Sequence, residues 1–190
     1  MGSFYTNVTL RVADRSRVKL DVNSHGLTAF VSRPENGAVV VFERSAEEQD
    51  PAVLERLAGD LSGRLGCAAL AVLNHDDSVL MYSLFEAGRR VDAYNSAPDY
   101  FDEGADLDRG GQPERLAQAF GVPERAPQLA AILGVPESAE EFVFEMERHE
   151  QLVEALALPR CAIGAGYNYL EAGEYPPGYT SEDFEHIGEG

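Results

Sequence analysis

Apolar and polar side chains alternate at the start of the chain with the period of two that is typical of a half-buried strand. One face of this predicted strand carries Phe4, Thr6, Val8, Leu10 and Val12, and the other carries Tyr5, Asn7, Thr9 and Arg11. Two further β-rich runs cover residues 28–32 and 38–43, and Pro34-Glu35-Asn36-Gly37 joins them. Because Asn-Gly readily adopts positive φ angles, these runs predict a hairpin with a tight turn.

Residues 15–25 fit two kinds of secondary structure. Val18, Leu20 and Val22 alternate as in a strand, whereas Val18 and Val22 also share one stripe of a helix. Gly26 ends the element in either case. The pattern therefore leaves helix and strand open for this segment.

Residues 51–65 carry the clearest helix signal. Asp50 is a favourable N-cap, Pro51 suits the first helical position and Gly66 suits the left-handed position after the last turn. The apolar stripe consists of Leu54, Leu57, Ala58, Leu61 and Leu65. The following apolar run, Cys67 to Leu73, predicts a buried strand.

Residues 79–86 and 90–94 predict two more strands, separated by turns. The order of elements in this half of the chain predicts an α+β fold in which helices back a largely antiparallel sheet. If residues 15–25 are helical, the arrangement is ferredoxin-like, an analogy of fold that carries no function.

The second half of the chain predicts short helices. Leu116-Ala-Gln-Ala-Phe-Gly-Val-Pro-Glu124 is echoed by Leu129-Ala-Ala-Ile-Leu-Gly-Val-Pro-Glu137, and each copy reads as one helix ended by glycine and proline. Ser138-x-x-Glu141 is a capping box that starts a third helix, expected to run to about Ala157. A terminal strand is expected at 167–170.

These patterns divide the chain into four consecutive parts. We expect a sheet-rich α+β part, an acidic Gly/Pro loop, a helical segment with its final strand packed on the same domain, and a solvated acidic tail. Their ranges are 1–96, 97–111, 112–172 and 173–190.

The composition suits one folded domain of an ordinary globular protein. Of the 190 residues, 44% are hydrophobic and 25% are charged, which argues against a disordered or coiled-coil chain. No apolar run approaches the roughly 20 residues that span a bilayer, and the amino terminus lacks the features of a secretory signal. Cys67 and Cys161 lie in apolar surroundings far apart in sequence, which predicts buried thiols in a reducing cytoplasm.

Lys19 is the only lysine among fifteen basic residues, which we interpret as GC-rich codon usage and hence a bacterial source. The formal net charge of −18 opposes contact with phosphate backbones and anionic membranes. We therefore expect no nucleic-acid or membrane partner and consider a basic protein partner the easier one to bind. The alternative is that the negative charge only keeps the protein soluble.

The best local cluster of chemically active side chains is Asn74-His75-Asp76-Asp77, between two predicted strands. One imidazole and two carboxylates suit a divalent cation or proton transfer. All four residue types also favour turns, so a hairpin turn is the simpler interpretation.

Arg148-His149-Glu150 resembles part of a zinc-protease helix, but the second histidine of HExxH is replaced by Val153. His149 lies on the apolar stripe of its helix and is expected to be a hydrogen-bonded core residue. Arg148 and Glu150 are expected on its solvated flanks.

Other familiar motifs also fail at named positions. The calcium-loop pattern that begins at Asp106 has Gly110 at a ligand position and Ala117 at the closing position. The pair Gly164 and Gly166 lacks the third glycine of a dinucleotide fingerprint, because Tyr169 follows instead, so we expect a turn with no helix after it. No nucleophile elbow or phosphate loop occurs, and we predict no metal and no cofactor.

The carboxyl-terminal stretch is rich in tyrosine, with Tyr167, Tyr169, Tyr175 and Tyr179. Tyrosine contributes contact area at low entropic cost, so this stretch is either a partner-binding surface or a strap that fastens the chain to its sheet.

Taken together, the missing motifs and the charge favour a non-catalytic protein-interaction protein, regulatory or immunity-like. The alternative is a small-ligand or metal-binding enzyme whose site combines the 74–77 turn with the 138–157 helix. The sequence carries no sign of symmetry, so it leaves the oligomeric state open.

Overall fold

The structure is a computed structural model that describes residues 2–101, 106–134, 142 and 144–188. Its centre is a seven-stranded antiparallel sheet with the strand order β6-β5-β4-β1-β3-β2-β7. The strands are β1 (Tyr5–Leu10), β2 (Ala29–Ser32), β3 (Val39–Glu43), β4 (Ala69–His75), β5 (Val79–Glu86), β6 (Arg89–Asn95) and β7 (Phe184–Ile187). The α+β prediction with an antiparallel sheet is confirmed.

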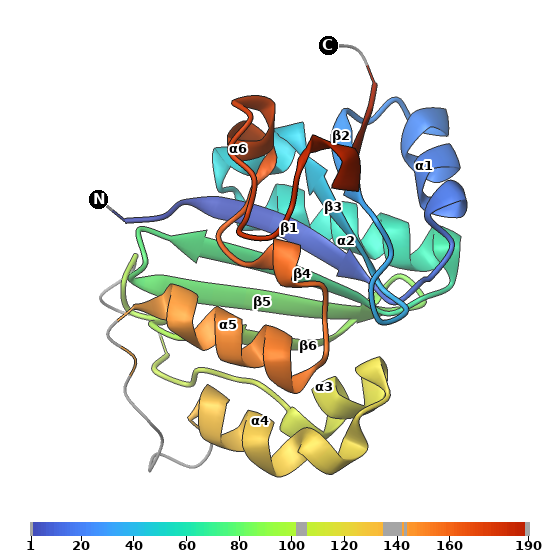
Figure 1. Cartoon of the computed structure of the whole chain (residues 1–190). Helices are drawn as coiled ribbons and strands as arrows, with labels where there is room; N and C mark the ends of the chain where they lie inside the picture. Colours follow the sequence, from blue (N-terminus) through green and yellow to red (C-terminus); the bar gives the residue numbers. More distant parts are fainter. Residues whose placement is uncertain (1, 102–105, 135–141, 143, 189–190) are drawn as a thin grey trace.

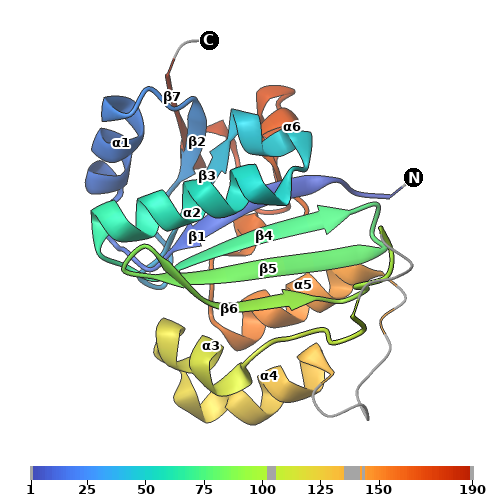
Figure 2. The same cartoon turned by 180° about the vertical axis from the view of Figure 1, so that it is seen from behind.

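Helices cover both faces of this sheet (Figures 1 and 2). One face carries α1 (Arg15–Ser24) and α2 (Pro51–Leu65). The other carries α3 (Pro113–Phe120), α4 (Ala126–Leu133), α5 (Glu145–Ala155) and α6 (Tyr167–Glu171). Because side chains alternate along a strand, successive residues of β4 belong to different cores. Val72 packs in the core on the α5 face of the sheet, and Leu73 packs in the core on the α2 face.

The ambiguous segment after the first strand is a helix. Asp14 caps α1, since its carboxylate accepts the backbone N–H groups of Ser16 and Arg17 at 3.0 and 3.4 Å. Val18 and Val22 are buried against the sheet, whereas Leu20 is 70% exposed. The helical stripe of Val18 and Val22 therefore describes this segment, and the strand-like alternation that includes Leu20 does not.

Two local predictions match the backbone closely. Asn36 and Gly37 have φ angles of 50° and 79°, as the tight hairpin requires. Asp50 caps α2 through a 2.8 Å contact with the Ala52 N–H, and Gly66 ends the helix at a φ of 62°. Likewise, Gly121 and Gly134 end the two repeated helices α3 and α4 in the left-handed region.

The buried strand β4 begins and ends two residues later than its apolar run suggests. Asn74 and His75 therefore belong to the strand, paired with Leu80 and Val79 of β5. The turn itself is Asp76-Asp77, with φ angles of 53° and 52°. Strand pairing with β1, in which Tyr5 faces Asn74, outweighs the polar character of these two residues.

The carboxyl-terminal predictions are wrong in two respects. Residues 167–170 form the helix α6 and not a strand, and the glycine pair before them is followed by this helix. The expected solvated tail contains β7, which pairs with β2 in a register that places Phe30 opposite His186. The edge of β2 offers unpaired backbone groups, and pairing satisfies them regardless of the acidic composition nearby.

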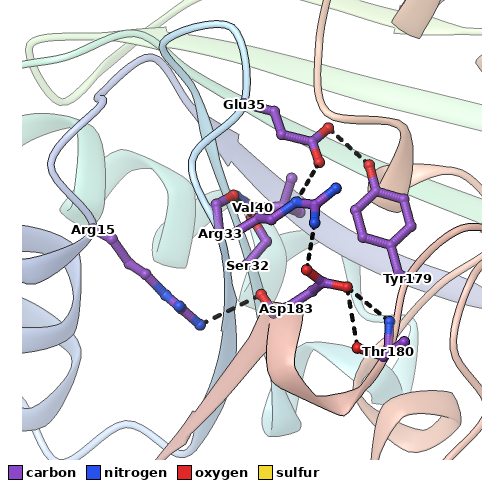
Figure 3. A network of polar contacts seen from close by, with 8 residues as sticks. All are labelled: Arg15, Ser32, Arg33, Glu35, Val40, Tyr179, Thr180 and Asp183. Carbon is purple, nitrogen blue, oxygen red and sulfur yellow. Dashed lines mark hydrogen bonds and ion pairs between the residues drawn. The ribbon is translucent and has the colours of Figure 1, made fainter.

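A polar network fastens this returning segment to the β2–β3 hairpin (Figure 3). Arg33 donates to Asp183 at 2.5 Å and to Glu35 at 2.8 Å, and the Tyr179 hydroxyl donates to the second oxygen of Glu35 at 2.8 Å. Beneath the network, the Phe184 ring packs against Phe42 and against two tyrosines. The strap interpretation of the tyrosine-rich stretch thus holds for Tyr179.

Among the residues that the structure describes, no helix combines the length and the apolar character needed to cross a membrane. The capping box Ser138-x-x-Glu141 lies outside the described residues, and the described part of the third helix begins at Glu145.

Candidate binding groove beside helix α5

A groove of about 450 Å³ lies between α5, the turn at residues 160–164 and the segment that follows α6. We call it the tyrosine groove. Its lining includes Met146, Glu150, Arg160, Tyr169, Glu174 and Tyr175. Its volume is within the range of roughly 300–1,000 Å³ that is usual for ligand sites. Two of the four carboxyl-terminal tyrosines therefore line a concave surface.

Negative charge exceeds positive charge around this groove. Arg160, the one cation among the described residues that line the groove, is shared between Glu150 at 2.7 Å and Glu154 at 2.6 Å. Glu174 is exposed and makes no ion pair with any residue that the structure describes. The lining thus retains carboxylate charge that a cationic group of a ligand can neutralise.

The tyrosine side of the groove is held in place by the sheet. The Tyr175 ring stacks on Phe184 of β7, with a centroid distance of 5.8 Å and an interplanar angle of 18°. The next lining residue, Pro176, is buried. Because β7 holds Tyr175, pairing of the carboxyl-terminal strand with the sheet positions this wall of the groove.

A buried polar pair joins β1 to α5, the helix that lines the groove. The Tyr5 hydroxyl lies 2.8 Å from Nδ1 of His149, and the two rings stack at 5.6 Å. Complete burial lowers the pKa of His149 to about 3, and burial raises the pKa of Tyr5. His149 is therefore the hydrogen-bonded core histidine that its apolar stripe predicts, neutral at physiological pH.

Arg148 is buried, at 3% exposure, so the prediction that it lies on a solvated flank is wrong. Its guanidinium pairs with Glu145 at 2.8 Å and donates to the carbonyl of Ile132. That carbonyl belongs to the last turn of α4, where carbonyls lack helical partners. Arg148 thus joins the two helices, while Glu150 is half-buried and belongs to the groove.

The turn at 74–77 meets α5 through Asp77. The Asp77 carbonyl accepts the Glu145 N–H at 2.9 Å, and its carboxylate accepts the Ser3 N–H at 3.1 Å and the Asn74 amide at 2.8 Å. All of these contacts are within the protein and order the turn. They leave Asp77 engaged as a structural acceptor.

His75 is not part of the same cluster as Arg148 and His149. It occupies the alternate position on β4 and points to the α2 face, where its Nδ1 lies 3.1 Å from Oε1 of Gln49. The sheet therefore separates the two histidines, while Asp76 lies exposed at the tip of the turn. Of the candidate residues in the 74–77 turn and on α5, only Asp77, Arg148 and His149 come together.

Tyr167 and Tyr169, the last two candidate residues, have different surroundings. Tyr167 is buried, and its hydroxyl lies 3.2 Å from both Glu171 and Nε2 of His186. Tyr169 is half-buried in the wall of the groove. In the predicted strand, Tyr167 and Tyr169 would share one face. They belong to a helix instead, where residues two positions apart point in different directions, so the sequence pattern did not reveal this difference.

Within the described ranges, no group of three or more His, Cys, Asp or Glu residues is placed to hold a metal ion. Asp106 and Asp108 accept the backbone N–H groups of Asp108 and Gly110 in consecutive turns. At Gly166, the Tyr167 N–H donates to Glu47 at 2.7 Å, so an internal carboxylate occupies the position that a phosphate would take.

The sequence did not indicate that Glu150 and Glu174 line the same concave surface. These residues are 24 positions apart, and no spacing rule connects a helix residue with a loop residue that packs beside it. The tyrosine content was the one usable signal. Comparisons of the chain with protein families, with characterised proteins and with solved structures found no match.

Proposed function

We propose that this protein is a non-catalytic interaction protein, regulatory or immunity-like, that binds a basic segment of a partner protein in the tyrosine groove. The observation that carries the proposal is the composition of the groove: two tyrosine rings beside carboxylates that outnumber their one cation. Tyrosine is favoured at protein interfaces, and lysine or arginine side chains pair with carboxylates and with aromatic faces.

The overall charge supports the same assignment. A net charge of −18 attracts a basic partner over distances of about a Debye length and speeds its encounter with the groove. The buried state of His149 also argues for binding, because a histidine held neutral in the core lacks the accessible proton exchange that acid–base catalysis requires.

The finer fold assignment belongs with this proposal. We infer that β1, α1, β2, β3, α2 and β4 form a ferredoxin-like unit, supported by the order β4-β1-β3-β2 and by the two helices on one face. In this interpretation, β5 and β6 extend one edge and β7 extends the other. The helices α3 to α6 then cover the open face, and α5 and α6 contribute residues to the groove.

A second candidate function is the binding of a small organic cation. The groove volume of about 450 Å³ favours it, because this volume also suits a free amine or guanidine ligand. A thermal-shift titration with spermidine, arginine and choline tests it. Stabilisation by one of these molecules, lost in Glu174→Gln, supports the small ligand.

The main proposal is tested with a fluorescent peptide of alternating glycine and lysine at low ionic strength. We expect binding that weakens as salt is added, and about fivefold weaker binding by the double variant Glu150→Gln/Glu174→Gln. The matched control is Glu114→Gln/Glu124→Gln, which removes the same charge from two exposed residues of the α3–α4 region. If both double variants lost the same affinity for the peptide, net charge alone would explain the change, which would contradict a role for the groove.

A further inference from the structure

Exposed aromatic rings gather around His75, on the face of the sheet opposite to His149. Phe4 is 40% exposed, Tyr100 is 47% exposed and Phe101 is 62% exposed. Among the described residues, Phe144 is the one further exposed phenylalanine or tyrosine. We call Phe4, His75, Tyr100 and Phe101 the aromatic patch.

The rings of the patch contact one another edge to face. His75 meets Phe4 at a centroid distance of 4.9 Å, Phe101 at 5.0 Å and Tyr100 at 6.0 Å, with interplanar angles of 86°, 75° and 68°. Tyr100 and Phe101 also meet at 4.9 Å and 80°. In a T-shaped pair the edge of one ring meets a face of the other, and the exposures of Phe4, Tyr100 and Phe101 show that part of each ring remains open to solvent.

The patch joins segments that are distant in sequence, and contacts with secondary-structure elements hold it in place. Phe4 precedes β1, His75 ends β4, and the aromatic pair follows β6. The 3.1 Å contact between His75 and Gln49 ties the centre of the patch to the start of α2. Exposed aromatic side chains that are grouped in one patch are typical of an interaction site.

The charged residues in the segments that build the patch are all acidic. Residues 2–5, 48–50, 74–78 and 97–101 contain five acidic residues and no lysine or arginine. The acidic residues are Glu48, Asp50, Asp76, Asp77 and Asp99, of which the Asp50 and Asp77 carboxylates accept backbone N–H groups of the chain itself. Open ring faces bordered by carboxylates are complementary to a guanidinium group, which stacks on aromatic rings through its plane and pairs with carboxylates through its edge.

We propose that the aromatic patch is a docking site for arginine side chains of a basic protein partner. The inference rests on the proposed function and adds a second contact surface and a preference for arginine over lysine. Lysine carries a compact, strongly hydrated ammonium group and gains less from ring faces. A second copy of the chain is a poor occupant, because two molecules of net charge −18 repel each other.

The test compares two fluorescent peptides of equal length, one alternating glycine with arginine and one alternating glycine with lysine. We expect the wild-type protein to bind the arginine peptide about threefold more tightly. The double variant Tyr100→Ser/Phe101→Ser should lose this preference while still binding the lysine peptide. Both side chains are largely exposed, so the fold should be retained, and circular dichroism checks this.

The control variant is Leu20→Ser, which removes an apolar side chain that is 70% exposed on α1. It should keep the preference for arginine. Equal affinity of the wild-type protein for both peptides, or an unchanged preference in the double variant, would overturn the docking site while leaving the groove proposal intact. Failure of both peptides to bind would instead remove the proposed function and this inference with it.

Sedimentation of the unliganded protein tests whether a second copy of the chain occupies the patch. We expect a monomer in both the wild-type protein and the double variant. A wild-type dimer that dissociates in Tyr100→Ser/Phe101→Ser would assign the patch to a second copy of the chain and overturn the arginine site.

Discussion

The hydroxyl of Tyr5 lies 2.8 Å from Nδ1 of His149, a contact between residues 144 positions apart that joins the first strand to helix α5. Both residues are almost completely buried, at 0% and 2% exposure. A buried polar pair of this kind stabilises one packing arrangement, because any other arrangement leaves a donor or an acceptor without a partner.

Protonation of His149 should couple the stability of the protein to pH. Its pKa is about 3 in the folded state and near 6.5 in the unfolded state, so between these values the unfolded state binds the extra proton. The free energy of unfolding should therefore fall as the pH drops below 6.5, by up to about 1.4 kcal/mol per pH unit from this residue. Urea unfolding from pH 7.5 to pH 4 measures the slope.

The variant His149→Asn isolates this contribution. Glu47 acts in the opposite direction, because burial raises the pKa of its carboxyl group, but that effect is common to both proteins. The difference in stability between the wild-type protein and the variant should shrink as the pH falls. A difference that is constant with pH would contradict a neutral, buried His149.

Removal of the Tyr5 hydroxyl should destabilise the protein by about 1–2 kcal/mol, since Tyr5→Phe leaves a buried ring nitrogen of His149 without its partner. Thermal or urea unfolding at pH 7.5 measures the change. Tyr100→Phe is the matched control, because Tyr100 is 47% exposed and surface substitutions change stability little.

The ion pair between Arg148 and Glu145 should be more important for folding than the pairs at the surface. Glu145→Gln leaves a guanidinium that is buried at 3% exposure without its charged partner, which is expected to cost about 3–5 kcal/mol of stability. Glu150→Gln should change the unfolding midpoint little, because its partner Arg160 is exposed. Similar midpoints for the two variants would contradict the buried role of Arg148.

Phe184 should hold both the edge strand and the groove. Phe184→Ala removes a ring that packs against Phe42, Tyr175 and Tyr179, with an expected loss of about 3 kcal/mol. Backbone amides of residues 175–187 should then exchange hydrogen faster, and the lysine peptide should bind more weakly. Protection that is unchanged in this segment would show that β7 is held by other contacts.

Gly166 should tolerate no side chain although its φ of −140° is accessible to any residue. A Cβ atom there would lie 2.3 Å from Oε1 of Glu47, whose carboxylate accepts the Tyr167 N–H. Gly166→Ala is therefore expected to cost about 1–3 kcal/mol in urea unfolding. Addition of Glu47→Asp shortens the obstructing side chain and should restore part of the loss, whereas no rescue would place the strain elsewhere.

Short-range physics made much of this fold predictable from the sequence. Asp50, Pro51 and Gly66 bound α2, Asn36-Gly37 bends the first hairpin, and glycine ends α3 and α4, because each of these effects depends on the residue and its immediate neighbours. The core position of His149 was predictable for a related reason, since an apolar stripe of a helix faces inward.

Contacts between distant segments decided the rest. Arg148 is buried because a carbonyl at the end of α4 and the carboxylate of Glu145 satisfy its charge, and no local pattern announces such partners. The acidic end of the chain forms β7 because β2 presents a free edge, and that pairing positions the Tyr175 wall of the tyrosine groove. The sequence by itself thus determined where elements begin, bend and end, whereas the tertiary structure decided which polar groups are desolvated together and which carboxylates and rings share a surface.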